Sequence, residues 1–127
     1  MSIRTPLARV RGLGAAKTGV GTFWIERVSA VALIPLTLWF LGSVVAFCGA
    51  DFDAVTAYIR NPVAAVLLIL FLGTSFVHAK LGLRVVVEDY IHRESSKIAL
   101  LVLIDFFTYL TGALAIYAVL EIAWKPV

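Results

Sequence analysis

Three long apolar runs constrain this chain more than any other feature of its sequence. They cover about residues 28–48, 63–91 and 98–120, and short polar stretches separate them. A helix needs roughly 20 apolar residues to cross a bilayer, and backbone inside lipid must satisfy its own hydrogen bonds. The length of 127 residues leaves no room for a separate soluble domain. We therefore predict an all-α membrane protein of three transmembrane helices, with residues 1–127 forming a single membrane-anchor domain.

The charged residues of the chain lie mostly outside these runs. Charged residues make up 15% of the chain and hydrophobic residues 61%, whereas soluble domains are about half apolar. The net charge of +3 is therefore interpreted as flanking charge that sets membrane topology, and nucleic-acid binding is not expected. Residues 1–27 contain no apolar core of a signal peptide, so we expect the first run to stay in the mature chain.

The distribution of basic residues predicts how the spans are oriented. The arm formed by residues 1–22 and the connection around residues 93–97 are basic, and the opposite side is not. The positive-inside rule then places the N-terminus in the cytoplasm and the C-terminus in the periplasm, as three spans require. The arm carries Arg4, Arg9, Arg11 and Lys17, the connection Arg93 and Lys97, and the opposite side only Arg60 and Lys125.

The second run contains polar residues at helical spacing. On a helix, Gly82 lies about 40° from His78, and Val85 and Asp89 each lie about 20° from it. These residues therefore share one face, with Asp89 about 16 Å further along the axis. A glycine one turn from an intramembrane histidine leaves space for a flat group beside the helix. The pattern favours a site on this face.

Haem is the group that best suits a neutral imidazole in an apolar site. A histidine hydrogen-bonded across helices is the alternative, and the sequence leaves it open. A six-coordinate iron needs a second axial ligand, and the other histidine, His92, lies about 21 Å from His78 along the same helix. If haem is present, another chain must therefore supply that ligand.

Asp89 and Tyr90 stand where the second run reaches the predicted cytoplasmic surface. A carboxylic acid and a phenol together can hydrogen-bond and protonate a ligand carbonyl. The alternative is that Tyr90 is an interfacial aromatic without a ligand, since tyrosines are common at membrane interfaces.

Two further ionisable residues lie at the other runs. Asp105 sits inside the third run and should face protein or water, with Lys80 or Arg84 as its partner. We favour a structural ion pair there over proton transfer. Arg27 precedes the first run, where it is either a snorkelling anchor or a ligand contact.

The string from His78 to His92, with Gly82 and Asp89-Tyr90 inside it, closely resembles the hydrophobic membrane anchor subunit of succinate dehydrogenase in its alphaproteobacterial or mitochondrial form. Residues 11–19 and 23–36 are similar to that family too. The resemblance covers nearly the whole chain, and its central motif is the specific part.

The resemblance implies a bacterial inner-membrane subunit of succinate dehydrogenase, respiratory complex II, which takes part in the tricarboxylic acid cycle without itself oxidising succinate. It implies a second three-span partner, the cytochrome b556 subunit, and flavoprotein and iron–sulfur subunits on the cytoplasmic face. His78 would be an axial ligand of a shared haem b, and Tyr90 would donate to the carbonyl of ubiquinone with Asp89 beside it. Gly82 and Arg27 would lie near the haem.

Other interpretations remain open. A fumarate-reducing relative would keep the complex and reverse its direction. A cofactor-free membrane assembly protein would explain the apolar runs but not the shared face of His78, Gly82 and Asp89. A small transporter subunit would use Asp105, and it would need internal repeats that the sequence does not contain.

Overall fold

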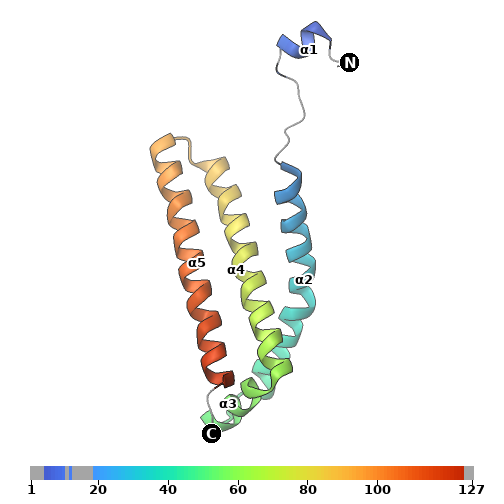
Figure 1. Ribbon diagram of the computed structural model, residues 1–127, viewed down its shortest axis with the longest axis vertical. Helices are drawn as coiled ribbons and strands as arrows, with labels where there is room; N and C mark the ends of the chain where they lie inside the picture. Colours follow the sequence, from blue (N-terminus) through green and yellow to red (C-terminus); the bar gives the residue numbers. More distant parts are fainter. Residues whose placement is uncertain (1–4, 11, 13–18, 125–127) are drawn as a thin grey trace.

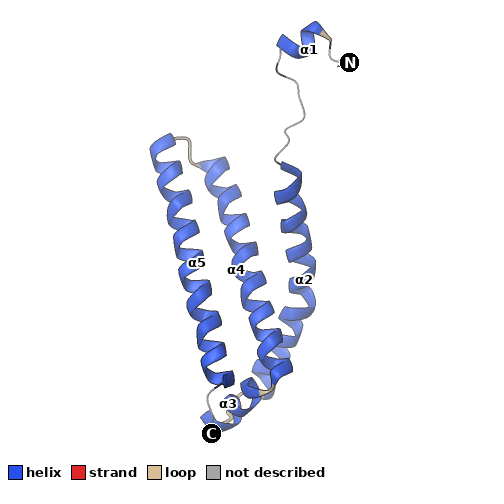
Figure 2. Cartoon of the chain, in the orientation of Figure 1, coloured by secondary structure: helices blue, strands red, loops and turns tan. Residues whose placement is uncertain are grey.

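A computed structural model describes residues 5–10, 12 and 19–124. Throughout these residues the only regular elements are helices, coloured blue in Figure 2, which confirms the predicted all-α class. They are α1 (Pro6–Val10), α2 (Gly19–Ala46), α3 (Phe52–Arg60), α4 (Pro62–Tyr90) and α5 (Glu94–Trp124). Of the residues used to predict topology, Arg4, Arg11, Lys17 and Lys125 lie outside the described residues.

Helices α2, α4 and α5 form a row with α4 in the middle, as Figure 1 shows. Helix α4 packs against α2 on one side and α5 on the other, and short α3 packs against α4 and α5. The start of α2 and the turn between α4 and α5 lie at one end of the row, and α3 lies at the other (Figure 1). The basic connection around residues 93–97 therefore shares an end with the start of α2.

All three long helices are apolar enough to cross a membrane over 27, 29 and 31 residues, which confirms the predicted number of spans. Their packing leaves little core, because the buried apolar side chains of the described residues are only Ala64, Ala65, Val87 and Val119. Large apolar side chains are instead exposed along every long helix. Such surfaces need lipid or other membrane subunits around them.

Helix α4 has well-defined ends. Its start is set by Asn61, whose side chain accepts hydrogen bonds from the backbone N–H groups of Val63 and Ala64. Pro62 follows in the first turn, where its missing N–H costs nothing. The helix ends at Tyr90, so His78, Gly82 and Asp89 lie on one uninterrupted helix that runs from the apolar segment to the end of the row.

The helices extend beyond the predicted apolar runs. Helix α2 begins at Gly19, so the last part of the predicted arm is helical, and α1 lies within that arm. Residues 52–60, predicted as a polar connection, form α3. Asp51 caps α3 by accepting a hydrogen bond from the N–H of Ala54 at 2.9 Å, which stabilises this short helix. The helix contains polar residues, so a search for apolar runs does not detect it.

A small residue allows α5 to approach α4 closely. Gly112 is buried, and a Cβ atom built on it would lie 3.5 Å from the ring of Phe76. Gly112 therefore lies on the packing face between α4 and α5. The contact sets the rotation of α5 and turns Asp105, two helical turns earlier, towards α4.

Candidate functional site

His78 lies half-buried on α4, on the side of that helix that faces α2. Its ring nitrogen Nδ1 is 2.9 Å from the hydroxyl oxygen of Ser29 on α2, a residue 49 positions away in sequence. This is the only hydrogen bond that the His78 ring makes within the described part of the chain, so its other ring nitrogen, Nε2, is left available to a ligand.

Ser29 contacts His78, and sequence analysis did not identify this contact. It is the one buried polar residue among those described, with 7% of its surface exposed. Its hydroxyl also donates to the backbone carbonyl of Glu26 at 2.9 Å. A serine inside an apolar helix is a weak signal because serines often bond to their own backbone. Only the packing of α2 on α4 reveals the contact with His78.

The face of α4 beyond His78 is open. Gly82, one turn further on, is exposed, and an added Cβ would meet nothing within 4 Å. No side chain of the described residues therefore fills the space beside Gly82. A planar group next to this helix would find a single available imidazole nitrogen and an adjacent surface without a side chain, which fits a haem ligated by His78.

Neighbouring residues donate hydrogen bonds to the backbone carbonyls at the end of α4. The N–H of Ile91 donates to Val87 at 3.0 Å, and the Lys97 ammonium donates to the carbonyl of Glu88 at 3.2 Å. The ring of His92 lies 3.1 Å from the Tyr90 carbonyl through Nδ1, which must donate because a carbonyl only accepts. These bonds satisfy carbonyls that a helix end leaves unpaired. The last turn of α4 is thereby fixed.

Asp89 and Tyr90 extend from this fixed turn into the surroundings. Both are exposed, and Tyr90 has 75% of its surface accessible. Asp89 lies about 20° from His78 around the helix and Tyr90 about 120° from it. No hydrogen bond joins the two side chains within the described structure. The acid and the phenol are thus both available to a ligand or partner outside this chain.

Arg27 lies on a different side of α2 from the residue that contacts His78. It lies about 160° around α2 from Ser29, and its guanidinium carbon is 5.2 Å from the centre of the Phe23 ring. Such a cation–π contact suits a residue at the membrane surface. The interfacial interpretation of Arg27 is thus supported by this contact.

Two open grooves follow the seam between α2 and α4. One of about 440 Å³ includes Ser29 and Thr74 in its lining, and one of about 450 Å³ includes Glu26, Arg84 and Glu88. The seam is therefore incompletely filled by this chain, both beside the Ser29–His78 bond and towards the end that carries Asp89 and Tyr90.

Comparison with known proteins identifies the family. The family model described as succinate dehydrogenase/fumarate reductase transmembrane subunit matches residues 1–112. The chain belongs to this family. It is a transmembrane subunit of an enzyme complex of the succinate dehydrogenase and fumarate reductase type, and its three spans make it a multi-pass protein of the inner membrane. The resemblance seen in the sequence is confirmed.

Individual relatives agree with the family assignment. The chain is 33% identical over 114 residues to a succinate dehydrogenase hydrophobic membrane anchor subunit of Paracoccus denitrificans, covering 90% of this chain and 88% of that protein. It is 29% identical over 116 residues to a subunit of the same name from Rickettsia bellii, covering 91% and 93%. A succinate dehydrogenase membrane anchor subunit of Porphyra purpurea is 32% identical over 107 residues.

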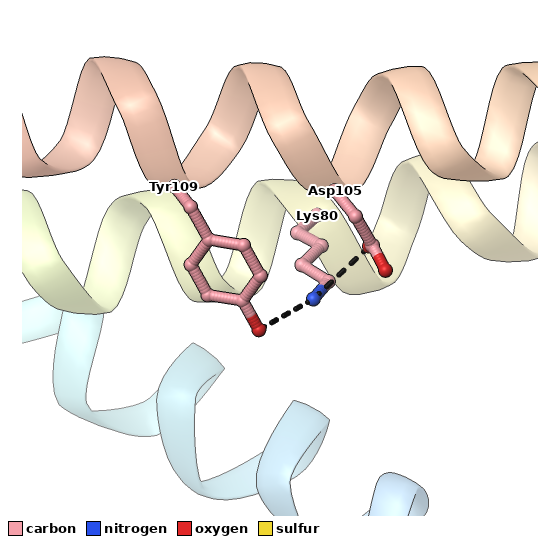
Figure 3. Close-up of polar contacts among 3 residues, drawn as sticks. All are labelled: Lys80, Asp105 and Tyr109. Carbon is pink, nitrogen blue, oxygen red and sulfur yellow. Dashed lines mark hydrogen bonds and ion pairs between the residues drawn. The ribbon is translucent and has the colours of Figure 1, made fainter.

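This succinate dehydrogenase/fumarate reductase transmembrane subunit also contains a polar cluster between α4 and α5, drawn in Figure 3. The Lys80 ammonium lies 3.0 Å from Oδ1 of Asp105 and donates to the Tyr109 hydroxyl at 2.9 Å. It also lies 4.3 Å from the centre of the Tyr109 ring. The predicted pairing of Asp105 with Lys80 is thus confirmed. The cluster joins two spans on the side of α4 away from Ser29.

Replacing Lys80 with methionine is expected to destabilise the subunit by about 3 kcal/mol, because an unpaired carboxylate at Asp105 is costly inside a span. The double variant Lys80→Met, Asp105→Leu should recover most of that loss, since neither charge remains. Thermal unfolding of the purified complex in detergent measures both effects. The control is Arg84→Met, which lies one turn from Lys80 and has no ion pair in the described structure.

The same double variant separates the two interpretations of Asp105. A structural pair predicts normal quinone reduction once stability is recovered. Restored stability with lost quinone reduction would instead assign the carboxylate to proton transfer.

Proposed function

We propose that this subunit is the hydrophobic membrane anchor of succinate dehydrogenase, respiratory complex II, in the bacterial inner membrane. In this role it helps to bind haem b and ubiquinone, and electrons from succinate oxidation pass to the quinone beside it. The observation that carries the proposal is that one rigid helix, α4, presents both His78 with an available Nε2 and, about 18 Å further on, Tyr90 with an exposed phenol.

His78 is proposed as one axial ligand of haem b, which supplies one-electron chemistry when bound. The role fits the half-buried position of the imidazole and the open surface at Gly82. This chain offers no second histidine within reach, because His92 lies about 21 Å further along α4. The second ligand is therefore assigned to the partner membrane subunit, cytochrome b556. The position of the Arg27 guanidinium over the Phe23 ring does not support a contact between Arg27 and the haem.

Tyr90 and Asp89 are proposed to bind the quinone. Reducing a quinone to a quinol takes two electrons and two protons, so the site must meet both the electron donor and water. Tyr90 can donate a hydrogen bond to a quinone carbonyl, and Asp89 can exchange protons with water. Both are exposed at the end of α4, while the apolar part of that helix provides surroundings suited to the ring.

The proposed orientation puts this end of α4 in the cytoplasm. The start of α2 and the basic connection that contains Arg93 and Lys97 lie at the same end of the row, as the positive-inside rule requires of one face (Figure 1). The flavoprotein and iron–sulfur subunits are proposed to dock at this end. Electrons leaving the iron–sulfur protein would then arrive beside Tyr90.

Purification of the intact complex through a tag on this subunit tests the proposal. We expect a flavoprotein, an iron–sulfur protein and a second membrane subunit to co-purify, with a reduced haem b band in the visible spectrum. A subunit that purifies without haem and without these partners would favour a cofactor-free assembly protein. The family also includes fumarate reductases, so the rates of succinate oxidation and fumarate reduction by the complex should be compared. A faster fumarate reduction would show that the complex works in the direction opposite to the one proposed.

A further inference from the structure

The contact between Ser29 and His78 determines which nitrogen of the imidazole carries the proton. The Ser29 hydroxyl has a single hydrogen but can accept two hydrogen bonds. It lies 2.9 Å from the backbone carbonyl of Glu26 and 2.9 Å from Nδ1 of His78. A carbonyl only accepts, so the hydroxyl hydrogen goes to Glu26. Both contacts are satisfied together only when Nδ1 of His78 carries a hydrogen and donates it to Ser29.

This arrangement leaves Nε2 of a neutral His78 without a hydrogen and with its lone pair directed away from Ser29. An imidazole binds a metal through the nitrogen that lacks a hydrogen, and the bond made by the other nitrogen selects the tautomer and the ring orientation. Ser29 is 7% exposed, so water does not compete strongly for the bond. The bond also joins α2 to α4, so the packing of the two spans holds it in place.

We propose that Ser29 is a positioning residue for the haem iron: it fixes His78 in the tautomer that ligates through Nε2 and makes that nitrogen a stronger donor. The inference rests on the proposed function, in which His78 is the axial ligand. It adds a residue of α2 to a site otherwise built on α4. Ser29 itself does not contact the iron.

The inference predicts the sign of a change in reduction potential. A hydrogen bond accepted from Nδ1–H increases the electron density on Nε2, which stabilises the ferric state more than the ferrous state. Removing the acceptor with Ser29→Ala should therefore shift the midpoint potential of haem b in the positive direction. It should also weaken haem binding by roughly 10-fold, the lower end of the effect of removing such a partner.

An optical redox titration of haem b in the intact membrane complex tests this prediction. Ser29→Ala should show the positive shift, and Ser29→Thr, which keeps the hydroxyl, should retain the wild-type potential. The matched control is Ser43→Ala. Ser43 lies about 40° from Ser29 around the same helix, donates to the Trp39 carbonyl at 2.9 Å, and contacts Tyr58 instead of a histidine. It should leave the potential unchanged.

A wild-type potential in Ser29→Ala would overturn the inference. If Ser29→Ala does not assemble, Ser29→Cys replaces it: this variant keeps the side-chain volume but has a weak acceptor, so an unchanged potential would overturn the inference equally. His78→Ala distinguishes an error in the proposed haem ligand from an error in the proposed role of Ser29. If His78→Ala retains the haem b spectrum, the proposed ligand is wrong; if it loses the spectrum while Ser29→Ala keeps the wild-type potential, only the role of Ser29 is wrong.

Discussion

Replacing His78 with alanine is expected to abolish the haem b band of the membrane complex while the subunits still assemble. The imidazole is the one nitrogen ligand that α4 offers within the apolar part of the span, and an iron that loses an axial ligand loses the main bond to this chain. The variant leaves no buried donor unpaired, because the Ser29 hydroxyl keeps its bond to the Glu26 carbonyl. Misfolding should therefore not obscure the result.

The chain contains a matched control for this experiment in His92→Ala. His92 lies on the exposed end beyond α4, where its ring contacts the Tyr90 carbonyl. Its removal should leave the reduced haem b spectrum unchanged. Difference spectra of the two purified variants, normalised to the flavin content of the complex, measure the effect. An unaltered haem b band in His78→Ala would rule out ligation at this position.

The spans could be predicted from the sequence because membrane burial is a local requirement. Each run of apolar residues must form its own backbone hydrogen bonds in lipid, whatever its neighbours do. The same requirement of the membrane interior identified Asp105 as a residue in need of a cation. Helix α3 was missed because its stability comes from the Asp51 cap and from packing on its neighbours rather than from an apolar run.

The contact between Ser29 and His78 could not be predicted in the same way. It depends on how α2 is rotated against α4, and helices that are apolar on every side carry no sequence pattern that fixes this rotation. The sequence identified His78, Gly82 and Asp89 as one face because they share a helix. A partner 49 residues away on another helix requires the packed structure.

The site is also incomplete within this chain, for a physical reason. Within the described residues, Nε2 of His78 and the phenol of Tyr90 make no hydrogen bond, and no side chain fills the space beside Gly82. The ion pair of Lys80 with Asp105 and the packing contact of Gly112 are instead made within the chain. Polar groups that a membrane protein leaves unsatisfied are expected to meet a cofactor, a substrate or another subunit.

Tyr90→Phe is expected to slow quinone reduction by roughly 10²-fold, the lower range for loss of a positioned proton donor. Within the described structure the Tyr90 hydroxyl makes no hydrogen bond, and its side chain is 75% exposed. Removing this oxygen therefore breaks nothing inside the subunit. A loss of activity must then come from a group outside the chain, which the proposal identifies as the quinone carbonyl.

Two assays on the same preparation isolate this step. Succinate oxidation with a water-soluble electron acceptor bypasses the quinone site and should be unchanged in Tyr90→Phe, whereas reduction of a ubiquinone analogue should fall. Tyr117→Phe is the matched control, since Tyr117 on α5 is 63% exposed and equally free of hydrogen bonds in the described structure. It should behave as wild type in both assays. The Tyr90 hydroxyl makes no hydrogen bond within the described residues, so the variant should change only contacts with other molecules. Unchanged ubiquinone reduction in Tyr90→Phe would therefore contradict a role for Tyr90 in the quinone site.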